Sequence, residues 1–172
     1  MQLNSVPHLT LAKAAKEIKA KRLSPVELTK AMLDQSYALN PTVNAYITIS
    51  AENATRDAQK AEFEIMQGTY RGSLHGIPIA LKDLYETKGI LTTGGSKILA
   101  NWIPQHDSAV VSKLKSAGAI SLGKLNMHEF AYGVTTINPH YGASRNPWNL
   151  NHITGGSSGG SGAAVAAGMC IA

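Results

Sequence analysis

Apolar side chains recur at helical spacing in two stretches near the start of the chain. Thr10 precedes the first stretch and Ser24 the second, and either hydroxyl can cap a helix by accepting hydrogen bonds from the first turn. After Ser24, Pro25 suits the first helical position and Glu27 completes a capping box. The dipeptide Asn40–Pro41 then predicts the end of the second helix.

A short strand and a third helix are predicted next. Residues 45–49 (AYITI) combine β-branched and aromatic side chains, which is typical of a strand. Ser50 is the candidate cap of a helix that carries alanines along one side and runs to about Met66. Gly68 ends that helix.

From Gly76 onward the pattern alternates between strands and a helix. Residues 77–81 (IPIAL) predict a buried strand that ends at Lys82, and Ser108 begins a helix. The inner face of that helix is predicted to hold Val110, Val111, Leu114 and Ala117. Residues 119–122 (AISL) predict the next strand. This strand–helix–strand order indicates a βαβ unit and an α/β fold, with a mixed sheet covered by helices.

The last forty residues divide into a polar and an apolar part. Residues 133–154 are rich in Asn, Pro and Gly and predict a long loop, and a loop of this length is usually functional. Residues 161–172 predict an alanine-rich helix.

The composition is that of an ordinary globular protein. Of 172 residues, 44% are apolar and 16% are charged, a balance that argues against a disordered chain. The net charge of +5 owes much to a cluster near the start of the chain: Lys13, Lys16, Lys19, Lys21 and Arg22. This cluster fits either a nucleic-acid contact or the solvated face of a helix.

The cysteine content and the hydropathy of the chain indicate the cellular compartment that we expect for the protein. Cys170 is the single cysteine, so no intrachain disulfide can form and a reducing compartment is expected. No apolar run approaches the length that spans a bilayer, and residues 1–10 lack the apolar core of a signal peptide. We therefore expect a cytoplasmic protein with no membrane partner.

Two apparent ligand motifs fail on inspection. The segment Gly118–Lys124 has the spacing of a phosphate-binding loop, but Leu125 follows where a Mg²⁺-binding Ser or Thr is required. His128–Glu129 lacks a second histidine four residues after the first, and the six histidines do not cluster at metal-ligand spacing. We expect no nucleotide, metal or other cofactor.

Two features do indicate a functional site. The run Gly155–Gly162 (GGSSGGSG) leads directly into an apolar helix, so its N–H groups can face an anion, whereas a flexible linker would have a similar composition but a different context. Lys82 ends a strand at the edge of the sheet where α/β proteins bind ligands. Lys82 is either a surface lysine paired with Asp83 or, if buried, a general base.

Four segments together resemble the amidase signature family: Gly76–Asp83 (GIPIALKD), Gly123–Ala131 (GKLNMHEFA), Arg145–Trp148 (RNPW) and Thr154–Ser161 (TGGSSGGS). They occur in the family's order and spacing, and the resemblance covers nearly the whole chain. It implies the N-terminal part of the amidase-signature fold, with residues 1–172 as a single domain. A helical region would span residues 1–70 and the start of the amidase core residues 71–172.

The resemblance also implies a Ser–Ser–Lys catalytic triad. Lys82 matches the family's lysine base, and Ser157 matches its bridging serine, which follows a cis peptide bond from Gly156. Ser158 and Ser161 would support the loop by hydrogen bonding. The supporting and substrate-binding residues of this loop would be Gly156, Ser158, Gly159, Gly160 and Ser161. The nucleophilic serine of the family lies further along the chain, so we expect it beyond Ala172.

The substrate and the assembly have alternatives. The first is an amidase that cleaves a small carboxylic amide, alone or as a homodimer, and residues 132–142 (YGVTTINPHYG) favour it. The second is the A subunit of a glutamyl-tRNA(Gln) or aspartyl-tRNA(Asn) amidotransferase, with partner subunits and tRNA. The third is a non-catalytic remnant. Because residues 168–172 are apolar, the chain by itself is expected to expose a strand edge, to self-associate and to lack activity.

Overall fold

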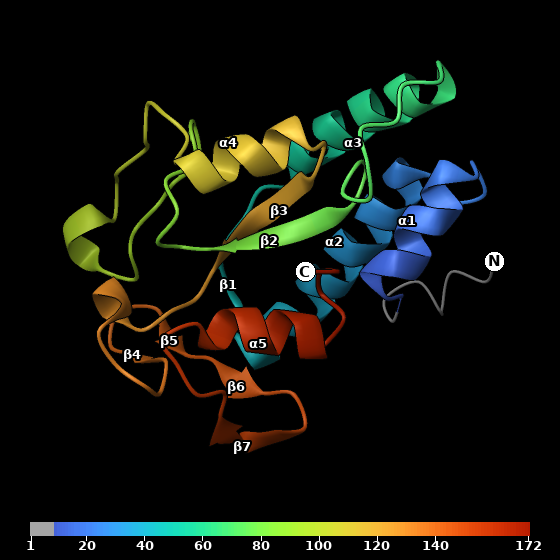
Figure 1. Ribbon diagram of the computed structural model, residues 1–172. Helices are drawn as coiled ribbons and strands as arrows, with labels where there is room; N and C mark the ends of the chain where they lie inside the picture. The colour runs from blue at the N-terminus through green and yellow to red at the C-terminus, as the bar shows by residue number, and fades with distance from the viewer. Residues whose placement is uncertain (1–8) are drawn as a thin grey trace.

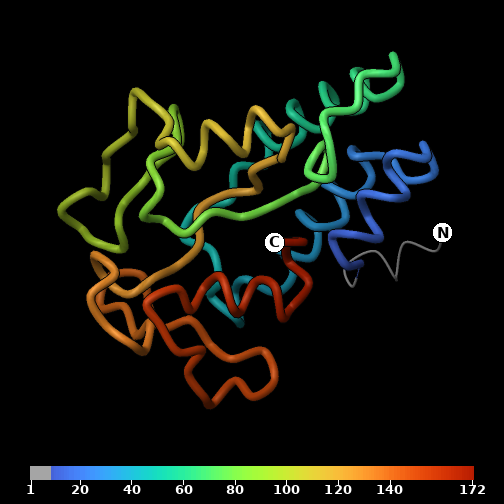
Figure 2. The backbone as a smooth tube through the Cα atoms, viewed as in Figure 1, coloured from blue at the N-terminus to red at the C-terminus, as the bar shows by residue number. Residues whose placement is uncertain are grey.

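The computed structural model describes residues 9–172, and residues 1–8 of the predicted helical region lie outside it (Figures 1 and 2). The helices are α1 (Leu11–Lys19), α2 (Pro25–Val43), α3 (Ala51–Met66), α4 (Ala109–Ser116) and α5 (Gly159–Ala166). The strands are β1 (Tyr46–Ile49), β2 (Pro78–Lys82), β3 (Ile120–Leu125), β4 (Ile137–Asn138), β5 (Gly142–Ala143), β6 (Arg145–Asn146) and β7 (Asn149–Ile153). Two short 3₁₀ turns are η2 (Lys97–Leu99) and η3 (Glu129–Ala131).

The main sheet is mixed and has strand β3 at its centre. Strand β2 pairs with β3 in parallel and β1 pairs with β3 antiparallel, which gives the order β1-β3-β2. In Figure 1, helix α4 lies above strands β2 and β3, and helix α5 lies below them. The predicted α/β fold and the βαβ unit β2-α4-β3 are confirmed.

Two of the predicted helix caps are present, and the predicted start of a further helix at Ser108 is capped as well. The hydroxyls of Thr10, Ser24 and Ser108 accept hydrogen bonds from the first turns of α1, α2 and α4. Ser50 stands at the cap position of α3, but its side chain makes no capping hydrogen bond, so that part of the prediction is wrong. The loop conformation of Ser50 is set instead by its N–H group, which donates to the carbonyl of Leu122 in β3 at 2.8 Å.

Helix α2 does not end at Asn40–Pro41 as predicted; it continues to Val43. Pro41 lies in the last turn, so its missing N–H group removes one hydrogen bond near the end of the helix rather than in its interior. The hydrogen bonding resumes at Asn44, whose N–H group donates to the carbonyl of Asn40 at 2.8 Å. Asn44 has a φ of 52°, and this left-handed residue ends the helix.

The second half of the chain also differs from the prediction in three places. Residues 133–154 are not one loop, because they form the hairpins β4-β5 and β6-β7. Helix α5 begins at Gly159, inside the Gly/Ser run, and ends at Ala166 rather than at residue 172. Val110 is 46% exposed instead of facing inward, whereas Val111 is buried.

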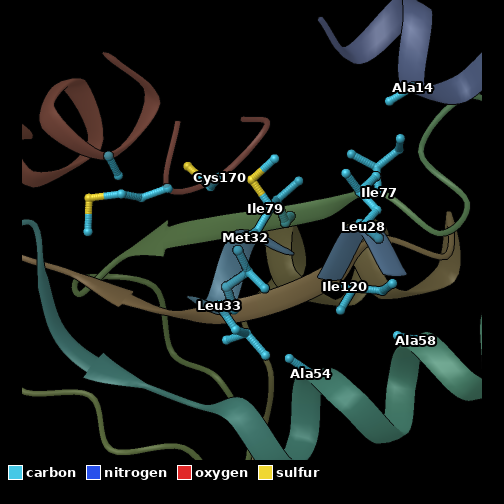
Figure 3. Packing of buried hydrophobic residues seen from close by; sticks show 14 of the residues in the cluster. Ala14, Leu28, Met32, Leu33, Ala54, Ala58, Ile77, Ile79, Ile120 and Cys170 are labelled. Carbon is cyan, nitrogen blue, oxygen red and sulfur yellow. The ribbon is translucent and has the colours of Figure 1, made fainter. Parts of the chain in front are cut away.

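The hydrophobic core fills the space between the sheet and its helices (Figure 3). Its labelled members come from α1, α2, α3, the two parallel strands with their flanks and the segment after α5: Ala14, Leu28, Met32, Leu33, Ala54, Ala58, Ile77, Ile79, Ile120 and Cys170. Full burial of a large aliphatic side chain contributes about 1.5–3 kcal/mol. This core therefore fixes the ends of β2 and β3, where the candidate site begins.

The apolar residues after α5 are packed rather than exposed. Met169 and Cys170 are buried. Beyond them, the N–H group of Ile171 donates to the carbonyl of Pro78, and the carbonyl of Ala172 accepts from Ala80. Residues 171–172 thus occupy the outer edge of β2, and the expected apolar patch is wrong for Met169 and Cys170. Self-association stays a prediction.

Within residues 9–172, no helix is long and apolar enough to cross a membrane. In the same range, no three metal-ligating side chains of the His, Cys, Asp or Glu type come together. The cytoplasmic location stays a prediction.

Candidate functional site

The side chain of Lys82 meets that of Ser157 at the end of strand β2. Lys82 is the last residue of the strand, and its Nζ atom lies 2.6 Å from Ser157 Oγ. The two residues are 75 positions apart in the sequence. The predicted contact is confirmed.

Ser157 is held by backbone geometry on both sides. The peptide bond from Gly156 to Ser157 is cis, as the resemblance implied. The carbonyl of Ser157 accepts a hydrogen bond from the N–H group of His128 at 3.0 Å. Because His128 follows the end of β3, this bond ties the serine loop to the sheet that carries Lys82.

Burial changes the chemistry of Lys82. The side chain is half-buried, and the loss of hydration lowers the pKa of its amine from the ordinary value. A lower pKa increases the fraction of neutral amine near neutral pH. A neutral amine at hydrogen-bonding distance from a hydroxyl can accept the proton of that hydroxyl.

The last four N–H groups of the Gly/Ser run, those of residues 159–162, are used within the protein rather than presented to an anion. Gly159 N donates to Thr136 Oγ1 at 3.0 Å, and Gly160 N donates to the carbonyl of Asn126 at 3.0 Å. Ser161 N and Gly162 N both donate to the carbonyl of Ser158. The expectation that these N–H groups face an anion is therefore wrong for residues 159–162.

Two of the glycines are required by close packing. A Cβ atom at Gly159 would overlap Thr154 Oγ1, and one at Gly160 would overlap the carbonyl oxygen of Asn126. Both separations would be far below van der Waals contact. Gly160 lets the start of α5 lie directly against the chain that leaves β3, and Gly159 lets it lie against Thr154.

Ser158 and Ser161 support the loop in a different way from the one expected. Ser158 is exposed and Ser161 half-buried, and neither hydroxyl is hydrogen-bonded to another residue within 9–172. The support comes from the Ser158 carbonyl, which accepts the two N–H groups of the following turn. Substrate binding by Gly156, Ser158, Gly159, Gly160 and Ser161 stays a prediction.

Asp83 pairs with a lysine other than Lys82. Its carboxylate is fully buried and lies 3.5 Å from the Nζ atom of the equally buried Lys124. It also accepts hydrogen bonds from the N–H and hydroxyl groups of Thr93. The interpretation of Lys82 as a surface lysine paired with Asp83 is thereby excluded.

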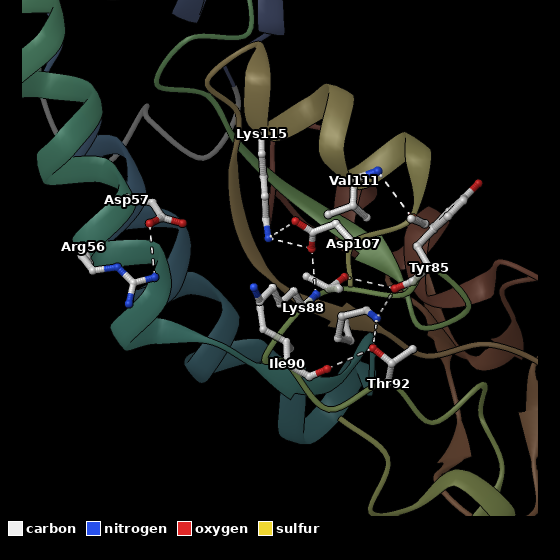
Figure 4. Close-up of polar contacts among 12 residues, drawn as sticks. Arg56, Asp57, Tyr85, Lys88, Ile90, Thr92, Asp107, Val111 and Lys115 are labelled. Carbon is white, nitrogen blue, oxygen red and sulfur yellow. Dashed lines mark hydrogen bonds and ion pairs between the residues drawn. The ribbon is translucent and has the colours of Figure 1, made fainter. Parts of the chain in front are cut away.

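Lys124 belongs to strand β3, so the segment Gly118–Lys124 is not a phosphate-binding loop. Its Nζ atom donates to the carbonyl of Tyr85 at 2.6 Å and to Thr92 Oγ1 at 2.7 Å. Burial lowers the pKa of Lys124 to about 8, although Asp83 acts in the opposite direction. Tyr85 and Thr92 come from the loop after β2, and Figure 4 shows them close together.

The loop after β2 is also joined to α4, through an ion pair between Asp107 and Lys115. The carboxylate of Asp107 binds the Lys115 amine at 2.8 Å and accepts from the N–H group of Lys88 at 2.7 Å (Figure 4). The segment that follows Lys82 is therefore held at both ends.

Three further side chains organise the site, and the sequence reasoning did not identify them. Asn126 Nδ2 donates to the carbonyls of Asn44 and Gly142. Asn138 Nδ2 donates to the carbonyls of Gly95 and Met127 at 2.7 and 2.9 Å. Thr136 accepts the N–H group of Gly159, as described above. Thr136 and Asn138 lie in the polar stretch 133–154 that was expected to be functional, and Asn126 lies in the segment Gly123–Ala131 that resembles the family.

Comparison with known proteins gives a consistent result. The family described as Amidase matches residues 27–172. Among curated proteins, the A subunit of glutamyl-tRNA(Gln) amidotransferase from Desulfatibacillum aliphaticivorans is 49% identical over 95% of this chain and 33% of its own length. Its counterpart from an Azoarcus species is 50% identical over 92% of this chain and 32% of its own length. The chain spans about a third of the length of these curated relatives.

Solved structures match over nearly all of the chain. A vestigial protein complex described as revealing the evolutionary origins of an s-triazine catabolic enzyme has a TM-score of 0.91 at 39% identity. It aligns with 94% of this chain and 36% of its own. The peptide amidase of Stenotrophomonas maltophilia has a TM-score of 0.87 at 34% identity, over 94% of this chain and 34% of its own.

Proposed function

This chain belongs to the amidase family, and we propose that it carries the base and the bridging serine of an enzyme that cleaves the C–N bond of an amide. The hydrogen bond between Lys82 Nζ and Ser157 Oγ is the observation that supports this function most strongly. A lysine whose pKa is lowered by burial, in contact with a hydroxyl, is suited to proton transfer.

In the proposed mechanism, neutral Lys82 accepts the proton of Ser157 Oγ while Ser157 accepts the proton of a nucleophilic serine. That serine attacks the amide carbonyl, and an acyl-enzyme forms as the C–N bond breaks. The proton held at Lys82 returns through Ser157 to the departing nitrogen. Water then attacks the acyl-enzyme by the same proton path and releases the acid. The nucleophile is proposed to come from outside residues 1–172.

A second candidate is the A subunit of a glutamyl-tRNA(Gln) amidotransferase, in which the amide would be that of glutamine. The observation in its favour is sequence identity of 49–50% to such subunits, against 34–39% to the two solved structures described above. The Lys82–Ser157 contact serves either function, because both begin with attack on a carboxamide.

Ammonia release by the product of the intact gene tests both the chemistry and the substrate. We expect turnover of either simple carboxylic amides or glutamine, and loss of that turnover in Lys82→Met, which keeps the length of the side chain but removes the amine. Lys113→Met is the matched control, because Lys113 is exposed on α4. Unchanged turnover in the folded Lys82→Met variant would rule out the proposed base.

The two substrates separate the two candidates. Release of ammonia from simple amides by the protein alone supports the stand-alone amidase. Release from glutamine only when partner subunits are present supports the amidotransferase.

A further inference from the structure

Thr136 has an unusual backbone conformation beside the serine loop. Its φ is +53°, in the left-handed region that β-branched residues rarely adopt, and the residue is completely buried. A residue keeps such a conformation only when its surroundings determine it. The contacts of Thr136 show which neighbouring groups determine this conformation.

The hydroxyl of Thr136 lies between the glycines on either side of the Ser157–Ser158 pair. It accepts the N–H group of Gly159, the first residue of α5, at 3.0 Å. A Cβ atom at Gly156 would lie 2.9 Å from the same oxygen. The loop that carries Ser157 is therefore packed against Thr136 before and after the serine.

Thr136 is also hydrogen-bonded to a residue outside the loop that carries Ser157. Its carbonyl accepts the N–H group of Ser144 at 3.2 Å. Two residues later, Asn138 joins the same segment to the carbonyls of Gly95 and Met127. A shift of the Thr136 hydroxyl would thus move the serine loop relative to a segment that is fixed to the rest of the site.

We propose that Thr136 is a positioning residue, whose hydroxyl sets the distance between Ser157 Oγ and Lys82 Nζ by holding Gly159 N and filling the space beside Gly156. The proposal rests on the proposed amidase function. It assigns to Thr136 no contact with substrate.

The proposal distinguishes the hydroxyl from the rest of the side chain. Valine has the shape of threonine but leaves the buried N–H group of Gly159 without an acceptor, which is costly. The start of α5 would then move to find another partner, and Ser157 would move with it. Serine keeps the acceptor and loses only the methyl group.

The test compares Thr136→Val with Thr136→Ser in the product of the intact gene. We expect Thr136→Val to lower kcat by about 10–100-fold with little change in KM, because a misplacement of about 1 Å can cost 10²-fold in rate. Thr136→Ser should stay within about threefold of the original kcat. Thr29→Val is the matched control, because Thr29 is buried on α2 and its hydroxyl has no hydrogen-bond partner within residues 9–172.

Circular dichroism and thermal unfolding of each variant separate positioning from folding. A lower Tm with unchanged kcat per folded molecule would show that Thr136 only stabilises the fold, and would overturn the proposal. Equal losses in Thr136→Val and Thr136→Ser would overturn it as well, since the hydroxyl would not matter. If Lys82→Met keeps full turnover, the proposed function fails, whatever the Thr136 variants show.

Discussion

Lys82 is half-buried and Lys124 is fully buried on neighbouring strands, and the two amines have different partners. Lys124 has an acidic partner, Asp83, and two neutral acceptors, which compensate its charge in part. Lys82 has the hydroxyl of Ser157 as its hydrogen-bond partner within residues 9–172, and burial lowers its pKa. Burial alone therefore does not mark a base; the neutral hydroxyl partner distinguishes Lys82 from Lys124.

The lowered pKa of Lys82 predicts a pH dependence of activity. Only the neutral amine accepts a proton, so kcat/KM for amide hydrolysis should rise with pH as Lys82 loses its proton. Because burial favours the neutral form, the midpoint of the rise should lie below the ordinary lysine value of 10.5. A pH–rate series on the intact protein measures this midpoint, and a profile that falls through the same range would contradict the assignment.

The buried pair of Asp83 and Lys124 predicts a stability effect without a direct role in proton transfer. Lys124→Met leaves the Asp83 carboxylate buried and uncompensated, which should cost about 3–5 kcal/mol of unfolding free energy. The double variant Asp83→Asn with Lys124→Met should recover part of that loss. Urea unfolding measures the unfolding free energy of the single variant and of the double variant. A double variant that is less stable than Lys124→Met would mean that the pair does not couple as proposed.

At the scale of elements, the start of α5 is defined by what it touches rather than by helix propensity. Gly160 lies against the backbone carbonyls of Asn126 and Ala45, neither of which can move aside easily. Gly162 is on the same helix and has nothing within 4 Å of the Cβ position. These two glycines therefore respond differently to the same substitution.

Gly160→Ala should destabilise the protein by about 1–3 kcal/mol, since the new methyl group would overpack the junction with β3. Gly162→Ala should be neutral or should stabilise it by up to about 1 kcal/mol, because alanine is the better helix former. Urea unfolding of the two variants is the measurement. Similar effects at both positions would show that α5 does not pack as described.

Some elements are predictable from local sequence signals and others are not, for physical reasons. The caps at Thr10 and Ser24, the helix start at Ser108 and the βαβ unit have local signals, so the sequence predicts them. The hairpins within residues 133–154 contain strands of only two to five residues, too short for a periodic pattern. The end of α2 is hard to predict because Pro41 lies inside the last turn. The helix ends at Asn44, a residue that is a weaker stop signal than glycine.

At the scale of the whole molecule, the site joins segments far apart in the sequence. The Lys82–Ser157 contact was predicted through the resemblance to a family, not through any local pattern. Asp83–Lys124 and Thr136–Gly159 were not predicted, because such contacts depend on how β3 and the 133–154 segment pack. The residues with proposed chemical roles, Lys82 and Ser157, are thus predictable from the sequence, whereas the residues that position them are not.

The relay between Lys82 and Ser157 is the central claim, and a double-variant cycle tests it most directly. Ammonia release by the intact protein is compared for Lys82→Ala, Ser157→Ala and the double variant. Each single variant should lose about 10²–10⁴-fold in kcat. Because groups that act as one unit are not additive, the double variant should be no slower than the slower single variant. Near-normal turnover in Lys82→Ala, or losses that multiply in the double variant, would contradict the relay.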